Sequence, residues 1–336
     1  MIYQKIQDLS QVAGISKHER IVQGIIHAID EQIITEGEVL PSVNMMVAEL
    51  GFARKTITKA YAELKERGII ESKNRMGYYV TGADTEQVIK VMLLLYAFHS
   101  VQKTFFSTFQ LAIGENAQID TFFHHNNPKV FRSLLTDNLG KYGMFIIAPI
   151  QAPEARDLLY LIPPKKLLLI DRHIEVKDHY SFITQKFADA LFLELSKVVD
   201  DIRQYEQMVL FYRGDTDFPS GTLKGFLKFV KQYKIKYQVE RLYLQNSLQS
   251  GTLYYTINDS DLWTLLRDCH DQQIELGKDI GILSQDETPL KEFLNGGIST
   301  FSTDFRFLAY RAAEFVHERK KVREILPSKI TRRTSF

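Results

Sequence analysis

From residue 89 to residue 284, short β-prone segments alternate with segments of helical periodicity. The expected order is strand 89–96, helix 103–113, strand 118–123, helix 129–139, strand 144–150, helix 154–161, strand 167–171, helix 182–199, strand 207–212, helix 223–233, strands 241–244 and 253–257, helix 262–276 and strand 279–284. This alternation is typical of parallel sheets with helices on both faces. About ten strands are more than one open sheet comfortably holds, so we expect two α/β lobes.

The first 80 residues follow a different pattern, with three helical segments before two β-prone ones. An isoleucine at every fourth position predicts a helix over 17–35. A short helix is expected over 42–51, between a serine cap and a glycine, and a third over 54–68. The segments 69–72 and 78–80 flank a basic turn and predict a hairpin. Three helices and a hairpin form a winged helix-turn-helix, whose third helix fits a DNA major groove.

Positive charge is concentrated in the expected third helix and hairpin. The whole sequence has 42 Lys+Arg and 41 Asp+Glu, a net charge of +1. Residues 51–82 hold Arg54, Lys55, Lys59, Lys65, Arg67, Lys73 and Arg75 against Glu63, Glu66 and Glu71. Such a local excess is expected where a protein meets DNA phosphates. The alternative interpretation is a solvated helix face.

Several motifs occur in a fixed order in the same region. They are Leu40-Pro41-Ser42, Ala48-Glu49-Leu50-Gly51, Arg54-Lys55-Thr56-Ile57, Ala60-Tyr61-Ala62-Glu63-Leu64, Gly68-Ile69-Ile70 and Gly77-Tyr78-Tyr79-Val80. This order resembles the DNA-binding domain of GntR-type bacterial repressors, which implies that Arg54 contacts a base or a phosphate. The expected DNA-binding residues are Ser42, Asn44, Arg54, Lys55, Thr56, Thr58, Lys59, Arg75 and Gly77. Asn44 replaces an arginine usual in that family, and Arg75-Met76-Gly77 replaces its Gly-x-Gly wing tip, so operator preference is expected to differ.

Polar residues follow several of the predicted strands of the second region. In open α/β sheets, ligands bind beyond the carboxyl ends of the strands. Sugars need carboxylate and amide partners for their hydroxyls and an aromatic ring against their C–H face. His99, Arg172, Asn258 and Asp286 fit the polar role, and Phe105, Phe106 or Trp263 fit the aromatic one. For each polar residue taken singly, the favoured interpretation is a structural turn residue.

A second family resemblance covers residues 88–336. It rests on Leu168-Leu169-Ile170-Asp171-Arg172, Asn258-Asp259, Asp279-Ile280-Gly281-Ile282-Leu283, Asp286-Glu287-Thr288, Ile298-Ser299-Thr300, Asp304-Phe305-Arg306 and the ending Leu326 to Ser335. These motifs resemble the sensor domain of LacI-type repressors, which implies two lobes joined by three crossovers, a dimer, and ligand contacts at Asn258 and Asp286. Phe105-Phe106 aligns with that family's aromatic pair. Thr222 stands where the family typically has an effector-gripping arginine, and Ser284-Gln285 replaces its glycine and aromatic, so altered specificity is expected.

The expected fold is therefore an N-terminal winged helix-turn-helix followed by a two-lobed α/β sensor of the periplasmic-binding-protein type. Residues 1–80 form the DNA-binding domain, 81–87 a linker and 88–336 the LacI-type effector-binding domain. The N-lobe is expected at about 88–176 and 303–320, and the C-lobe at about 177–302 and 321–336.

The sequence offers few features of other protein classes. Cys269 is the single cysteine, so an intrachain disulfide or a multi-cysteine metal site cannot form, and the spacing of His173, Glu175 and His179 fits no common metal site. Glycine-rich nucleotide motifs and a Gly-x-Ser-x-Gly hydrolase motif are missing, so neither a cofactor nor an enzyme is expected. An apolar run long enough for a membrane span or a secretory signal is missing too, and we expect a cytoplasmic protein.

Together these patterns predict a sequence-specific DNA-binding transcription regulator that works as a homodimer. Its partners are operator DNA and a small effector, a sugar or sugar derivative, bound between the lobes. We expect the protein to repress transcription until the effector binds, with activation of transcription as the alternative. Two other hypotheses stay open: a dimeric DNA-binding protein whose sensor is ligand-dead or binds a non-sugar, and a DNA-binding domain fused to an α/β enzyme.

Overall fold

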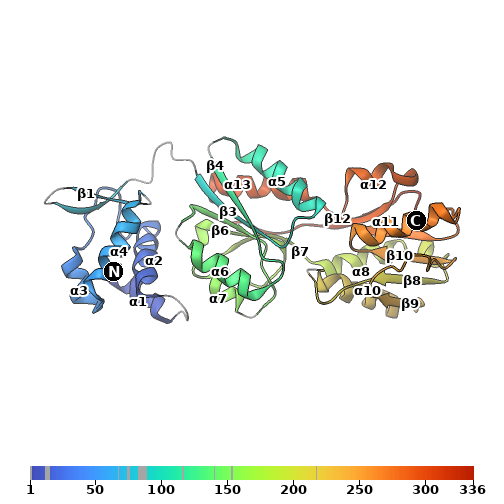
Figure 1. The fold of residues 1–336 in the computed structure, drawn as a ribbon, viewed down its shortest axis with the longest axis horizontal. Coiled ribbons are helices and arrows are strands. Elements are labelled where there is room, and N and C mark those ends of the chain that lie inside the picture. Colours follow the sequence, from blue (N-terminus) through green and yellow to red (C-terminus); the bar gives the residue numbers. More distant parts are fainter. Residues whose placement is uncertain are drawn as a thin grey trace.

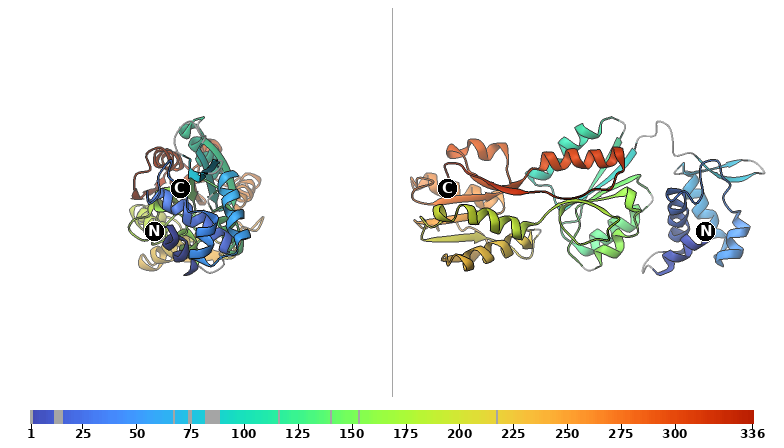
Figure 2. Two further views of the ribbon diagram at one scale, coloured as in Figure 1. Left: turned by 90° about the vertical axis from the view of Figure 1, so that its left-hand side faces the viewer. Right: turned by 180° about the vertical axis from the view of Figure 1, so that it is seen from behind.

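The computed structural model describes residues 2–11, 16–66, 68–73, 76–81, 89–115, 117–139, 141–152, 154–216 and 218–336. A helical N-terminal domain and two α/β lobes follow one another along a single long axis (Figure 1). The same linear order is seen from behind, and the three bodies overlap when viewed along that axis (Figure 2). Within the described ranges, no helix is both long and apolar enough to cross a lipid bilayer.

The N-terminal domain is a winged helix-turn-helix, which confirms the prediction from the sequence. Its elements are α1 (Ile2–Asp8), α2 (Lys17–Asp30), α3 (Val43–Leu50), α4 (Arg54–Glu66), β1 (Ile70–Lys73) and β2 (Gly77–Val80). Ser42 caps α3 by accepting a hydrogen bond from the backbone N–H of Met45, and Gly51 ends this helix in the left-handed conformation, with a φ of +64°. β1 and β2 pair as an antiparallel hairpin. The expected linker falls almost entirely on 82–88, outside the described residues.

Helix α1 is an element that periodicity alone did not predict. It packs across α2 at Gly24, where an added Cβ would lie 2.8 Å from the Cα of Ile6. Ile6 is fully buried in the core of this domain. A segment this short has too few turns to display a helical stripe, so its helix depends on the contact with α2.

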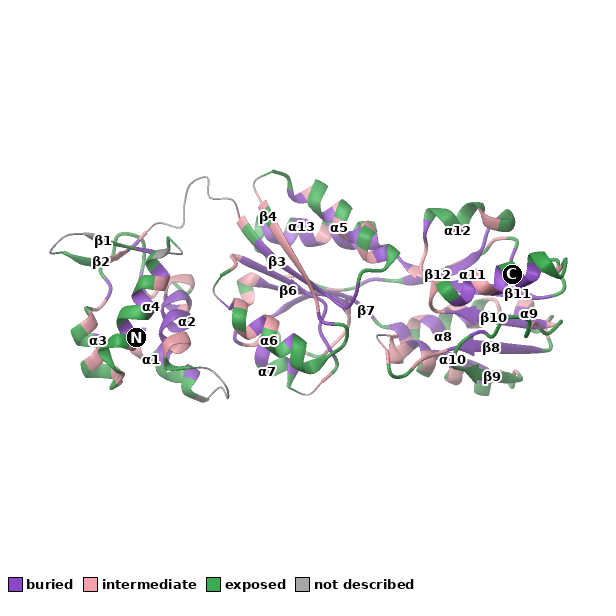
Figure 3. Ribbon diagram, viewed as in Figure 1, coloured by how far each residue is buried: buried purple, intermediate pink, exposed green. Residues whose placement is uncertain are grey.

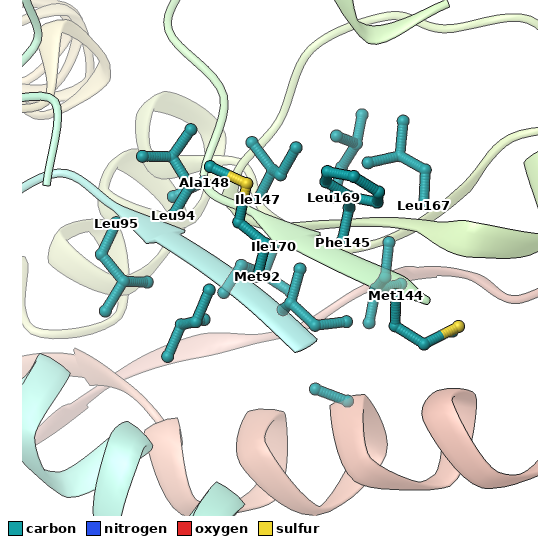
Figure 4. Close-up of a cluster of buried hydrophobic side chains, with 14 of the residues drawn as sticks. Met92, Leu94, Leu95, Met144, Phe145, Ile147, Ala148, Leu167, Leu169 and Ile170 are labelled. Atoms are coloured by element: carbon teal, nitrogen blue, oxygen red, sulfur yellow. The ribbon is translucent and has the colours of Figure 1, made fainter. Parts of the chain in front are cut away.

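The N-lobe holds a six-stranded parallel sheet. Its strand order is β13 (Arg323–Ile325), β7 (Ser181–Gln185), β6 (Leu167–Arg172), β5 (Met144–Ile147), β3 (Ile89–Leu95) and β4 (Ala117–Phe123). Helices α5 (Ser100–Ile113) and α13 (Phe305–Glu318) cover one face, and α6 (Pro128–Asn138) and α7 (Ala155–Leu159) cover the other (Figure 1). Buried side chains from β3, β5 and β6, among them Met92, Phe145 and Leu169, form the core (Figure 4).

The C-lobe is built in the same way. Its strand order is β14 (Ser328–Thr331), β12 (Ser299–Thr303), β11 (Gly281–Gln285), β10 (Thr252–Thr256), β8 (Gln207–Phe211) and β9 (Tyr237–Glu240), with only β14 antiparallel to its neighbour. This lobe has five helices, which are, in chain order, α8 (Phe187–Lys197), α9 (Val199–Ile202), α10 (Ser220–Gln232), α11 (Asp259–Asp271) and α12 (Pro289–Phe293). α8 and α10 cover one face, and α11 and α12 cover the other. The central strands of both lobes are buried, whereas the helices expose one side (Figure 3).

Two sequence-based assignments were wrong. The helix expected over 182–199 is the strand β7 followed by the helix α8. All five residues of β7 are buried, and a strand covered on both faces has no alternation to distinguish it from a buried helix. The strand expected over 241–244 is a loop, because the edge strand β9 lies earlier, at 237–240.

The two lobes are joined by three crossovers, later in the chain than expected. β7 and β13 pair within the N-lobe sheet, so the first crossover follows Gln185 rather than residue 176, and the third follows Ile325 rather than residue 320. One buried polar residue from each crossover joins a shared network. The Thr303 hydroxyl donates to Gln185 Oε1 (2.5 Å) and the Ser328 hydroxyl donates to the same atom (3.2 Å). We call these three residues the hinge trio.

The packing of α8 against α10 requires a residue without a side chain at Gly225. A Cβ added there would lie 2.6 Å from the backbone O of Ala188. Gly225→Ala is therefore expected to destabilise the C-lobe by roughly 1–3 kcal/mol, because overpacking outweighs the gain of about 1 kcal/mol in helix propensity. Urea unfolding measures this. Gly143→Ala is the control, since a Cβ there meets nothing closer than 3.7 Å; equal stability of the two variants would contradict the packing argument.

Candidate functional site

Helix α4 buries an apolar face and exposes a basic one. Ile57, Ala60 and Tyr61 are fully buried, while the basic side chains at its N-terminal end face solvent. Of the expected DNA-binding residues, Ser42, Asn44, Arg54, Lys55, Thr58, Lys59 and Gly77 are exposed, Thr56 is half-buried, and Arg75 lies outside the described residues. Exposed cations at the start of a helix of this size suit contacts to phosphates and base edges in a major groove.

Asn44 and Arg54 contact each other across the turn between α3 and α4. Arg54 Nη1 donates to Asn44 Oδ1 at 2.8 Å. The two helices are held in place by the Tyr61 hydroxyl, which donates to the backbone O of Pro41 at 2.6 Å. The departure at Asn44 therefore has a structural consequence, because this amide orients the guanidinium of Arg54.

The N-terminal domain contacts the N-lobe through the last turn of α2. His27 Nε2 lies 3.1 Å from the backbone O of Leu161, and Lys166 Nζ lies 3.0 Å from Asp30 Oδ2. Burial lowers the pKa of His27, so its ring is neutral near pH 7 and donates this bond through Nε2–H. Leu9 packs into the core of the N-lobe. The sequence offered no sign of this junction, whose residues come from three separate segments.

A cavity of about 480 Å³ lies between the two lobes. It is lined by the carboxyl ends of β6, β8, β10 and β11 and by the start of α5, as expected for a ligand site in parallel sheets. We call it the cleft. Its aromatic lining consists of Tyr96, Phe98, Phe187, Phe218 and Phe305.

Two carboxyl groups, the buried Asp171 and the half-buried Asp286, face the cleft from opposite lobes. Asp171 and Asp286 both adopt left-handed backbone angles, with φ of +67° and +66°, a strained conformation typical of functional positions. Asp171 Oδ1 accepts a hydrogen bond from Gln185 Nε2 at 2.7 Å. Burial raises the pKa of both groups, that of Asp286 to about 6, although the nearby Lys291 ammonium opposes this shift. The oxygens of both carboxyl groups can accept hydrogen bonds from the hydroxyl groups of a ligand.

Lys291 is a buried cation at the base of the cleft. Its Nζ donates to the backbone O atoms of Gln285 (2.7 Å) and Asp286 (3.0 Å) and lies 2.9 Å from Asp259 Oδ1. The side chain is 1% exposed, and a buried ammonium is tolerated only when it is paired in this way. Lys291 therefore fixes the loop that carries Asp286.

The structure brings some of the expected effector residues together and separates others. His99, Arg172, Asn258 and Asp286 line the cleft. Asn258 also caps α11 by accepting from the backbone N–H of Asp261. Phe105 and Phe106 pack in the N-lobe core, Trp263 packs against the C-lobe core, and Thr222 is fully buried in α10; none of these four lines the cleft.

Four charged residues of the cleft, Asp171, Arg213, Asp259 and Lys291, were not among the effector-binding residues expected from the sequence. Arg213 lies two residues beyond the end of β8 and directly follows the strand expected over 207–212, so the rule that placed the other strand-end residues would also have found it. Lys291 lies within α12 and carries no such signal.

Residues 17–80 match the family described as bacterial regulatory proteins, gntR family. This segment is a gntR-type DNA-binding domain. HTH-type transcriptional regulator Rv1152 of Mycobacterium tuberculosis is 28% identical to this chain over 72 residues. That match covers 21% of this chain and 60% of the relative's length.

The fold of the remaining chain matches solved repressor structures. The dimeric Lac repressor with an 11-residue C-terminal deletion has a TM-score of 0.60 at 15% identity, covering 74% of this chain and 98% of that one. A PurR family transcriptional regulator from Vibrio parahaemolyticus also has 0.60 at 15%, covering 73% and 98%. The trehalose repressor from Escherichia coli has 0.59 at 14%, covering 73% and 100%. The two lobes thus have the LacI/PurR-type fold.

Proposed function

We propose that this chain is a one-component transcription regulator, in which the gntR-type domain binds operator DNA and a small effector in the cleft controls that binding. One observation carries the proposal. A single chain joins an exposed basic recognition helix to a two-lobed fold whose cleft presents charged groups from both lobes. The simplest role for a folded two-lobed domain in the same chain as a DNA-binding domain is to control DNA binding in response to a ligand.

The hinge trio supplies a route from the cleft to the arrangement of the lobes. Gln185 donates to Asp171 in the cleft and accepts from the hydroxyls of Thr303 and Ser328 on the other two crossovers. An effector that contacts both walls stabilises the lobe arrangement in which those contacts form. Because the hinge trio joins all three crossovers, a contact at Asp171 acts on each of them.

The junction between α2 and the N-lobe supplies the next step. The contacts His27–Leu161 and Asp30–Lys166 tie the DNA-binding domain to the N-lobe surface. In a homodimer, a rotation of the two N-lobes then changes the spacing of the two recognition helices. Half-site spacing is fixed by DNA geometry, so this change alters operator affinity.

We propose that the protein is a cytoplasmic homodimer that represses transcription and that binding of the effector relieves this repression. We propose a regulator rather than an enzyme, and a sugar or sugar derivative as the effector. The strand-end carboxyls, the amide of Asn258 and the aromatic lining support this class of ligand.

The proposal is tested by selecting DNA from a random pool with the purified full-length chain and then screening small molecules. We expect a palindromic selected sequence, and a sugar-like compound that raises the Tm and weakens binding of that sequence by at least roughly tenfold. Linkage requires the selected DNA to weaken effector binding by the same factor. Failure to enrich any sequence would overturn the DNA-binding proposal. A selected sequence whose binding no compound changes would instead favour the ligand-dead sensor.

A further inference from the structure

Two arginines approach the cleft from opposite lobes. Arg172 ends β6 of the N-lobe, Arg213 follows β8 of the C-lobe, and both line the cavity. Burial raises the pKa of Tyr212, and the positive charge of Arg172 partly opposes this shift. Tyr212 is the neighbour of Arg213 in the chain. The charge of Arg172 therefore acts across the cleft on the strand end that carries the second guanidinium.

Arg172 is held in a defined orientation by an aromatic ring. Its guanidinium carbon lies 3.6 Å from the centre of the Tyr96 ring. A guanidinium stacked on a ring face directs its N–H groups outward in its own plane, in the geometry that carboxylates and phosphates match. This stacking also restricts the side chain before any ligand arrives, which lowers the entropy lost on binding.

Arg213 uses only part of its donor capacity. Its Nη2 lies 3.2 Å from Asp261 Oδ2, while the other oxygen of that carboxylate accepts the backbone N–H of Tyr243 at 3.1 Å. Arg213 Nε is buried and has no hydrogen-bond partner among the described residues. Buried donors are almost always paired in a folded protein, so this atom is suited to an acceptor that the protein chain does not supply.

The charges that line the cleft favour an anion on balance. Lys291 and Asp259 neutralise each other at 2.9 Å. Burial raises the pKa of Asp171, which favours its neutral form and reduces the repulsion it exerts. Asp286, whose pKa is about 6, is mostly ionised at pH 7, so the two arginines face one carboxylate of the lining.

Helix ends add to this positive potential. Ser100, the first residue of α5, and Pro219, the N-cap of α10, line the cleft. Pro219 provides no side-chain acceptor for the first N–H groups of α10, although its backbone O accepts from the N–H of Thr222 at 3.0 Å. The positive end of a helix dipole favours an anion nearby.

We propose that Arg172 and Arg213 form a split oxyanion subsite, and that the effector is a small polyhydroxylated compound bearing a carboxylate or phosphate group. The inference rests on the proposed function and names the effector class for the same cleft. Asp171 and Asp286 accept the hydroxyl groups, the aromatic lining takes the C–H face, and the anionic group bridges the two lobes. Only a ligand with that group engages both walls through the arginines.

The test uses matched sugars that differ at one carbon. The full-length chain is titrated with glucose, glucuronate and glucose 6-phosphate, and with the corresponding galactose and mannose sets, by thermal shift and calorimetry. We expect an anionic member to bind roughly tenfold to hundredfold more tightly than its neutral counterpart, the loss expected for an unmade charge-assisted hydrogen bond. The uronate and phosphate arms distinguish the two sources of the anionic group.

Variants assign the effect to the two arginines. Arg213→Gln and Arg172→Gln should each remove most of the preference for the anionic member. Arg203→Gln is the control and should retain the preference, because Arg203 is exposed, lies before β8 and is paired with Asp200. Unchanged binding of the selected DNA by each variant verifies that the chain is folded and keeps this test separate from that of the proposed function. A neutral sugar that binds as tightly as its anionic partner, or no response to any anionic member, would overturn the inference.

Discussion

Replacing Arg54 with alanine is expected to weaken binding of the selected operator by roughly tenfold to hundredfold, the range measured for loss of one specific base contact. Arg54 is exposed at the first turn of the recognition helix, where a guanidinium reaches the major groove. The side chain packs against nothing in the core, so the Tm should change little. Fluorescence anisotropy with labelled operator at fixed salt measures the affinity, and the effector-induced Tm shift should be that of the unaltered protein.

A second basic residue on α4 separates a specific contact from general charge attraction. Lys65→Ala removes the same charge from the last turn of the helix, where Lys65 Nζ donates to Ser72 Oγ at 2.9 Å. Loss of one charge at that distance should cost only a few-fold in affinity through counterion release. Asn44→Ala should give an intermediate loss, because it frees Arg54 without removing it. If Arg54→Ala and Lys65→Ala weaken binding equally, the specific role of Arg54 is wrong.

Local signals predicted the N-terminal domain well. The serine cap of α3, the left-handed Gly51 and the glycine before β1 are each fixed by backbone geometry within a few residues. Helix α1 escaped prediction because its stability depends on Gly24 and α2 rather than on its own periodicity. An element such as α3 could be predicted because its caps and turns lie within a few residues of it. An element such as α1 could not, because it depends on contacts with another helix.

In the lobes, the alternation of strands and helices predicted the architecture but not every element. β7 was missed because Phe182 and Ile183 lie in a strand buried on both faces, at a spacing that also fits the buried face of α8. Misplacing β7 also misplaced the first crossover. The hinge trio therefore could not be recognised from sequence, although Gln185 is the residue that links the crossovers to the cleft.

The cleft was predictable to the extent that it follows from strand ends. Arg172 and Asp286 were expected for that reason, and both line the cavity. The aromatic residues were assigned by alignment of Phe105 and Phe106, whose side chains instead pack in the N-lobe core. Thr222 stands where the resemblance to LacI-type sensors led us to expect an arginine. It is buried away from the cleft, and a different arginine of the C-lobe, Arg213, lines the cleft. The direction of a side chain around its helix decides such cases, and it depends on how the helix packs, which local sequence patterns do not reveal.

Asp286→Asn is expected to stabilise the protein and, in the same variant, to weaken effector binding. Asp286 is half-buried, and the rise of its pKa from 3.8 to about 6 means that ionising it in the folded chain costs free energy. Two pKa units correspond to about 3 kcal/mol at most, so removal of the charge should add roughly 1–3 kcal/mol to the free energy of unfolding near neutral pH. The amide keeps the shape of the side chain but is a poorer acceptor for a sugar hydroxyl, so effector affinity should fall by about tenfold or more.

The raised pKa of Asp286 determines how the stability gain of Asp286→Asn varies with pH. Between about pH 4 and pH 6 the unfolded carboxyl loses its proton while the folded one retains it, so the contribution of Asp286 to stability falls as pH rises. The stability gain of Asp286→Asn should therefore be small near pH 4, grow up to about pH 6 and stay constant above it. Urea unfolding of both proteins across this range measures the difference, and Asp178→Asn, at a side chain that is 99% exposed, serves as the control. A gain that is equally large near pH 4 would show that the charge of Asp286 is not its cause, and full effector affinity in the variant would remove Asp286 from the binding site.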